Sequence, residues 1–134
     1  MNRDDVFEFI CNYRRLSGKR KQKFLEEARL NSHDWLAIYK ACCYTDLKIV
    51  AAKMAVETAM SLADWVPIAE VNGDPLLREK GMEEVAKLEI TTEKDIDLLL
   101  KSSSAHLRSV GWWLDGKRRQ SARVAPNGMW SNAC

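Results

Sequence analysis

Three cationic side chains recur in this chain at an interval of 30 residues: Lys48, Arg78 and Arg108. Ammonium and guanidinium groups bind carboxylates and phosphates, so a column of such groups along one face could hold an anionic ligand. The basic column is therefore the first candidate for a binding surface.

The thiol and imidazole side chains are the candidates for a metal site or a disulfide, but their spacing favours neither. They are Cys11, Cys42, Cys43, Cys134, His33 and His106. No two cysteines form the Cys-x-x-Cys pair that is typical of structural zinc sites. We expect no metal and no cofactor, and thiols that act as small buried apolar side chains.

Motifs that carry catalysis are missing from the sequence. It contains no Gly-x-Ser-x-Gly, no His-Glu-x-x-His and no glycine-rich phosphate loop. The composition, with 46% hydrophobic and 30% charged residues, is that of an ordinary globular protein. We expect a protein that is not an enzyme.

Two adjacent tryptophans, Trp112 and Trp113, are candidates for a protein contact. Trp113 stands 60 residues after Lys53, at a position that we expect to face solvent. Trp112 stands 30 residues after Met82, at a position that we expect to face inward. Tryptophan and arginine dominate interface hot spots, so Trp113 near Arg108 could anchor a partner. The alternative is that both rings cover the last repeat.

The net charge of +2 is unevenly distributed. Residues 1–23 carry seven Lys and Arg against three acids, and residues 117–134 carry four against none. Residues 24–116 carry a net charge of −6. The basic ends could contact phosphates, but the acidic middle argues against a continuous nucleic-acid track.

The elements that position these side chains are helices, because apolar residues recur at steps of three and four. The 30-residue period also places Ala51, Gly81 and Gly111 at one position. Glycine inside a helix costs about 0.5–1 kcal/mol relative to alanine, so we expect two helices to approach closely there. A fixed period of this length predicts stacked helical pairs.

The period divides the chain into segments. We expect an N-terminal capping pair of helices over 1–31, with Asp4 or Asp5 at its first cap. Repeats should follow over 32–62, 63–92 and 93–116, and a basic tail over 117–134. Asn72-Gly73-Asp74-Pro75 predicts a turn with Asp74 as the next N-cap. Caps are also expected at Ser32, Asp64, Thr92 and Ser104. Met129-Trp130 could dock onto the open end of the stack.

The sequence resembles short HEAT-like repeats of the phycobilisome-lyase type. The best match is Asp74-Pro75-Leu76-Leu77-Arg78-Glu79-Lys80-Gly81, and the segments 104–111 and 44–51 follow it more loosely. The resemblance covers residues 33–116. It implies an all-α, right-handed α–α superhelix of about three repeats. It also implies that Lys48, Arg78 and Arg108 hydrogen-bond turn aspartates and the carbonyl oxygens of neighbouring units.

The function that this resemblance favours is a non-catalytic protein–protein interaction through the groove of the second helices. The candidate partner-binding residues are Lys53, Glu57, Arg78, Glu79, Glu83, Arg108 and Trp113. A solenoid end could also mediate self-association. The alternatives are a nucleic-acid-binding protein with a DNA-glycosylase-like fold, which would need Trp113 with Asp97 or Asp115 in a pocket, and a tetrapyrrole-lyase-like subunit.

The cellular setting follows from two further features of the sequence. No apolar run approaches the roughly 20 residues of a membrane span. The first residues carry acids where a signal peptide has a basic start. We expect no membrane contact and a cytoplasmic location.

Overall fold

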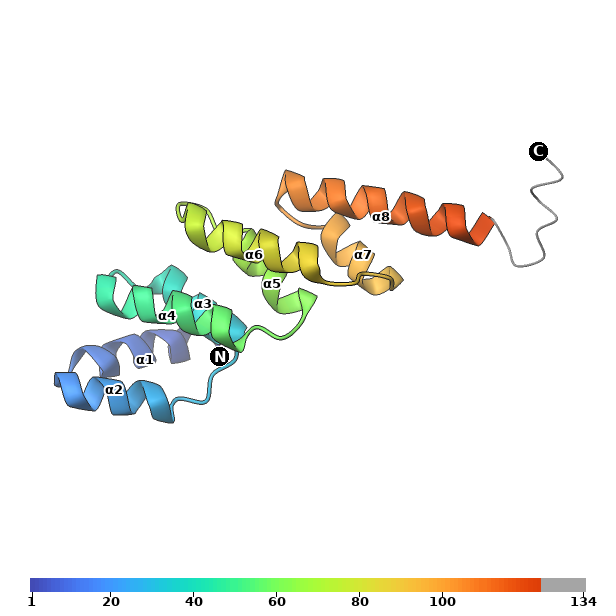
Figure 1. Cartoon of the computed structure of the whole chain (residues 1–134). Coiled ribbons are helices and arrows are strands. Elements are labelled where there is room, and N and C mark those ends of the chain that lie inside the picture. Colours follow the sequence, from blue (N-terminus) through green and yellow to red (C-terminus); the bar gives the residue numbers. More distant parts are fainter. Residues whose placement is uncertain (124–134) are drawn as a thin grey trace. The chain divides into compact units, whose positions relative to one another are not determined.

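The computed structural model describes residues 1–123, and it is all α-helical in that range, as predicted. The chain forms two compact units that divide between Ile68 and Ala69. The described helices pack in consecutive pairs along the chain, while a right-handed superhelix stays a prediction. In order they are α1 (Arg3–Arg14), α2 (Gly18–Glu27), α3 (Ser32–Ala41), α4 (Thr45–Thr58), α5 (Leu62–Ala69), α6 (Pro75–Lys87), α7 (Glu93–Leu100) and α8 (Ala105–Arg123) (Figure 1).

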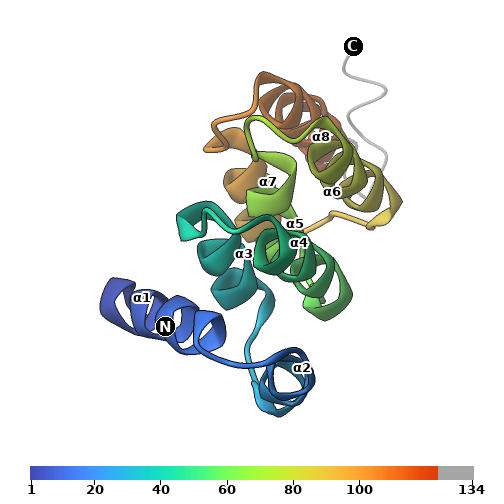
Figure 2. The same ribbon diagram turned by 90° about the vertical axis from the view of Figure 1, so that its left-hand side faces the viewer.

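Aromatic side chains form the centre of the first unit. In this unit α3 packs against both α1 and α4, and Figure 2 shows α3 between these two helices. The ring of Phe9 meets Trp35 edge-on at 5.8 Å, and it lies 4.7 Å from the ring of Phe24 in α2. Trp35 is fully buried. Trp35 therefore fills the core of this unit.

Two glycines let the helices of the second unit approach closely. A Cβ atom at position 81 would lie 2.5 Å from the backbone nitrogen of Ala69. Thirty residues later, a Cβ atom at Gly111 would lie 3.0 Å from the Cβ of Leu99. Ala51, the counterpart in the first unit, is fully buried. The packing reason predicted for the small residue at this position is confirmed at both glycines.

Three of the predicted helix caps are confirmed. The Asp74 carboxylate accepts from the Leu77 amide at 3.1 Å, with Pro75 as the first residue of α6. The Thr92 hydroxyl accepts from the Asp95 amide at 3.2 Å, and the Ser104 hydroxyl accepts from the Leu107 amide at 3.4 Å. These side chains satisfy amides that have no partner inside the helix.

Other predicted caps are wrong by one to three residues. Asn2, rather than Asp4 or Asp5, caps α1. Asn31 caps α3 in a capping box with Asp34, whereas the Ser32 hydroxyl is buried and donates to the carbonyl oxygen of Ala55 at 2.7 Å. Asp64 lies inside the first turn of α5, where it accepts from the amide of Met60. Asparagine and serine cap helices almost equally well, so the local sequence did not separate them.

The last helix extends past the predicted start of the basic tail at Lys117. It continues to Arg123, because lysine, arginine and glutamine favour helices and Gly116 alone does not stop one. An ion pair between Arg119 and Asp115 at 3.3 Å supports this extension. The proposed docking of Met129-Trp130 lies outside the described residues, as does Cys134.

Candidate functional site

A groove between the second helices of the first unit contains two of the predicted partner-binding residues, Lys53 and Glu57. This α2–α4 groove has a volume of about 500 Å³. Leu25 of α2 and Val50 and Met54 of α4 supply its apolar surface. The charged and polar residues that line it are Tyr13, Lys21, Gln22, Glu26, Lys53 and Glu57.

Both rims of the α2–α4 groove carry a basic and an acidic side chain. On α4, the Lys53 ammonium lies 3.9 Å from the Glu57 carboxylate, and both side chains are more than half exposed. On α2, the Gln22 amide donates to Glu26 at 3.3 Å. Exposed pairs of this kind contribute little to stability, so these groups stay accessible to a ligand.

Contacts among α1, α2 and α4 stabilise one end of the α2–α4 groove. The Tyr13 hydroxyl donates to the Asp46 carboxylate at 3.4 Å, and the Lys21 ammonium lies 3.7 Å from the same carboxylate. Lys21 also lies 5.0 Å from the centre of the Tyr13 ring. Burial raises the pKa of the Tyr13 phenol, and the nearby Asp46 charge adds to this effect. Together these contacts connect α1, α2 and α4.

The second unit presents the remaining predicted residues of α6 to solvent. Arg78, Glu79 and Glu83 are all exposed. One turn away, the Glu84 carboxylate accepts from Lys80 at 3.0 Å and from Lys87 at 3.1 Å. The hydrogen bond from Lys80 contributes most to lowering the pKa of Glu84, followed by the one from Lys87. The surface of α6 is therefore of mixed charge.

The two tryptophans of α8 are both exposed, Trp112 by 71% and Trp113 by 64%. The Lys117 ammonium lies 5.0 Å from the centre of the Trp113 ring. The exposed position of Trp113 agrees with the prediction. The inward position predicted for Trp112 is wrong: Met82 is half-buried at the equivalent position, but Trp112 lies in the last described helix.

Two positions of the basic column, Arg108 and Lys48, make contacts within the fold. The Arg108 guanidinium donates to the carbonyl oxygen of Ser102 at 2.8 Å, a structural contact with the turn of its own helical pair rather than with a neighbouring unit as expected. The Lys48 ammonium lies 4.9 Å from the centre of the Tyr39 ring. Arg108 is half-buried, so part of its hydrogen-bonding capacity is used within the fold.

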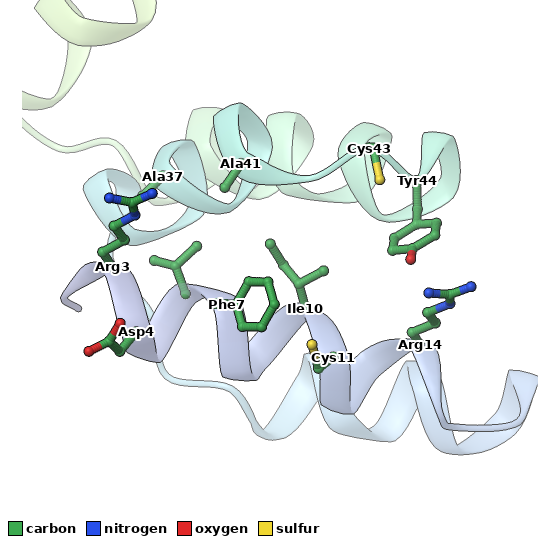
Figure 3. Close-up of a pocket in the computed structure, with 11 residues that line it drawn as sticks. Arg3, Asp4, Phe7, Ile10, Cys11, Arg14, Ala37, Ala41, Cys43 and Tyr44 are labelled. Atoms are coloured by element: carbon green, nitrogen blue, oxygen red, sulfur yellow. The ribbon is translucent and has the colours of Figure 1, made fainter.

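A second groove in the first unit, between α1 and α3, was not predicted from the sequence. This α1–α3 groove has a volume of ≈ 840 Å³ (Figure 3). The signal that could have found it is the large side chain Phe7, which lies off the core stripe of Val6, Phe9, Ile10 and Tyr13. The residues that line this groove are Arg3, Asp4, Val6, Phe7, Ile10, Cys11, Arg14, Ala37, Ala41, Cys43 and Tyr44.

The cysteines of the described residues are free thiols in three different environments. Cys42 is buried, Cys11 is half-buried and Cys43 is exposed. The Cys42 sulfur accepts from the Tyr44 amide at 3.3 Å, and burial raises the pKa of this thiol. Within residues 1–123, no three His, Cys, Asp or Glu side chains cluster in a way that could hold a metal ion.

The comparisons with known proteins add no identity. No protein-family model matches this chain, and neither the curated proteins nor the solved structures gave a match. None of the helices described here has both the length and the apolar character needed to cross a bilayer. The grooves and the exposed side chains are therefore the features of this chain that indicate a function.

Proposed function

We propose that this chain is a non-catalytic protein-interaction module that binds a protein partner through the α2–α4 groove. The observation that carries the proposal is the pairing of an apolar floor with rims of mixed charge. Lys21 and Glu26 lie on one side, and Lys53 and Glu57 lie on the other. A protein partner can match alternating charges around an apolar centre, because protein interfaces combine an apolar core with a polar rim.

A nucleic acid fits this groove less well than a protein does. Its phosphates would approach the carboxylates of Glu26 and Glu57 as closely as the two lysines. A phosphate would also meet carboxylates at the basic ends, because four of their cations lie within 4 Å of an Asp or Glu side chain. These pairs are Lys21–Asp46, Lys23–Glu27, Arg118–Glu93 and Arg119–Asp115. The paired cations and the groove carboxylates favour a protein ligand.

We also propose that the helical pairs are HEAT-like repeats. The support is the recurrence of one close contact at the repeat interval, Gly81 with Ala69 and then Gly111 with Leu99. In repeat proteins of this kind, extended surfaces bind partners. The exposed Arg78, Glu79 and Glu83 of α6, and Trp113 of α8, would then serve partner binding in the second unit.

Affinity capture from a lysate of the source organism tests the proposed function. The purified full chain should retain a protein partner that Lys53→Glu or Glu57→Lys releases. Two variants outside the groove, Lys40→Glu and Glu8→Lys, change the charge equally at exposed positions of α3 and α1 and should retain the partner. Equal retention by all four variants would remove the α2–α4 groove from the proposal.

A second arm of this experiment distinguishes a protein partner from a nucleic-acid partner. It also tests whether the partner contacts the second unit. Duplex DNA binding that weakens steeply with salt would support the nucleic-acid alternative. If the chain does not bind duplex DNA at low salt, the nucleic-acid alternative is excluded. If Glu83→Lys or Trp113→Ala also releases the captured protein, the partner-binding surface includes α6 or α8.

A further inference from the structure

The α1–α3 groove combines small side chains on one wall with a large exposed side chain on the other. Ala37 and Ala41 lie one turn apart on α3, and Phe7 of α1 lies in the same groove. Phe7 is 70% exposed. The alanines leave the space that larger side chains would fill, so the groove stays open beside an uncovered aromatic ring. Figure 3 shows Phe7 and Ile10 between α1 and the helix that carries the alanines.

Two arginines lie at opposite ends of the α1 wall of this groove. Arg3 and Arg14 belong to the same stripe of α1 as Phe7 and Ile10, and Figure 3 shows them on either side of these two apolar residues. At a rise of about 1.5 Å per residue, their Cα atoms are separated by roughly 16 Å along the helix. The Arg14 guanidinium lies 4.9 Å from the centre of the Tyr44 ring, which keeps its charge at the end of the groove.

One carboxylate, that of Asp4, lies among the groove residues beside Arg3. It reduces the positive potential at that end, so the Arg14 end is the stronger site for an anionic group. The groove therefore has a defined polarity: an apolar centre, a strong cationic end at Arg14 and a weaker one at Arg3.

We propose that the α1–α3 groove binds a helical segment of a partner protein whose apolar face is flanked by carboxylates about three turns apart. The apolar face would cover Phe7, beside the buried Ile10 that lines the groove, and the carboxylates would pair with Arg3 and Arg14. This charge complementarity selects an acidic amphipathic helix over a basic one. The proposal goes beyond the α2–α4 groove and does not depend on it.

The helical form of the occupant follows from the walls of the groove. Both walls are the sides of helices, whose backbone amides and carbonyls are already bonded within each helix. An extended peptide would bury its own backbone groups there without hydrogen-bond partners, which is unfavourable. A helix satisfies those groups internally and presents only side chains.

Selection from a displayed library of random 16-residue peptides on the purified full chain tests this proposal. Enriched sequences should place apolar residues at helical spacing and an Asp or Glu toward each end. Arg14→Glu should weaken binding of the synthesised peptide at least about tenfold. Arg15→Glu, which changes the charge equally at the adjacent exposed residue outside the groove, should leave binding unchanged. Asp4→Asn should strengthen it.

The groove thiols give a second readout of the same complex. In a Cys134→Ser background, the bound peptide should slow alkylation of Cys11 and Cys43, both of which line the groove. Enrichment of basic peptides, failure to enrich any acidic amphipathic sequence, equal binding by Arg14→Glu and Arg15→Glu, or unprotected thiols would each overturn the proposal.

Discussion

Gly81 of α6 lies against the backbone of Ala69, so closely that a Cβ atom on the glycine would come within 2.5 Å of the alanine nitrogen. The contact recurs 30 residues later between Gly111 and Leu99, where a Cβ atom would lie 3.0 Å from the Cβ of leucine. A Cβ atom at Gly111 would also lie 3.1 Å from the backbone nitrogen of Leu100, but the approach at Gly81 is closer. We therefore expect an added methyl group to lower the stability of the fold by different amounts at the two sites.

Gly81→Ala should lower the stability of the chain by about 1–3 kcal/mol, because overpacking outweighs the better helix propensity of alanine. Gly111→Ala should cost less. Gly116→Ala is the matched control: it lies in α8 with no atom within 4 Å of a new Cβ, and it should stabilise by roughly 0.5–1 kcal/mol. Urea denaturation checks this order, and equal stability of the Gly81 and Gly116 variants would contradict it.

Glu70 connects the end of α5 to the turn before α8. One oxygen of its carboxylate accepts from the Ser102 hydroxyl at 2.8 Å, the Ser103 amide at 2.7 Å and the Ser103 hydroxyl at 3.0 Å. Glu70→Ala should destabilise the second unit by about 1–3 kcal/mol and speed hydrogen exchange at the Ser103 amide. Glu79→Ala removes an exposed carboxylate from α6 and should do neither. Unchanged exchange at Ser103 would show that the turn holds without Glu70.

The thiols should react in the order of their exposure. In a Cys134→Ser background at pH 8, iodoacetamide should modify Cys43 first, Cys11 next and Cys42 last. Burial both shields the Cys42 sulfur and raises its pKa, so less of the reactive thiolate is present. Mass spectrometry of the alkylated peptides measures the three rates. Early modification of Cys42 would mean that the turn between α3 and α4 opens.

The pKa of Glu84 should lie below that of an ordinary glutamate, because Lys80 and Lys87 donate hydrogen bonds to its charged form. A lowered pKa in the folded state means that the stabilisation is present above about pH 4.5 and is lost as the pH falls through the folded-state value. Lys80→Met should raise this pKa more than Lys87→Met does. Carbon-detected NMR titration of the carboxyl group measures both, and an unshifted midpoint in the wild-type chain would contradict the contact.

The sequence predicted those features that depend on local spacing. The 30-residue period identified the glycine positions, because equivalent positions of a repeat have similar neighbours. The Asp74-Pro75 pair identified the start of α6, because a cap acts within the first turn. Trp112 was placed wrongly, since its environment depends on whether another helical pair follows. The α1–α3 groove was missed for a related reason: it depends on Ala37 and Ala41, distant in sequence from Phe7, leaving space beside that ring.

Hydrogen–deuterium exchange of the full chain, with and without its captured protein partner, tests the central claim most directly. The account predicts that the partner slows exchange in peptides from α2 and α4, and that Lys53→Glu abolishes this protection while Lys40→Glu preserves it. Protection confined to other helices, or equal protection in both variants, would contradict the assignment of the α2–α4 groove as the partner-binding surface.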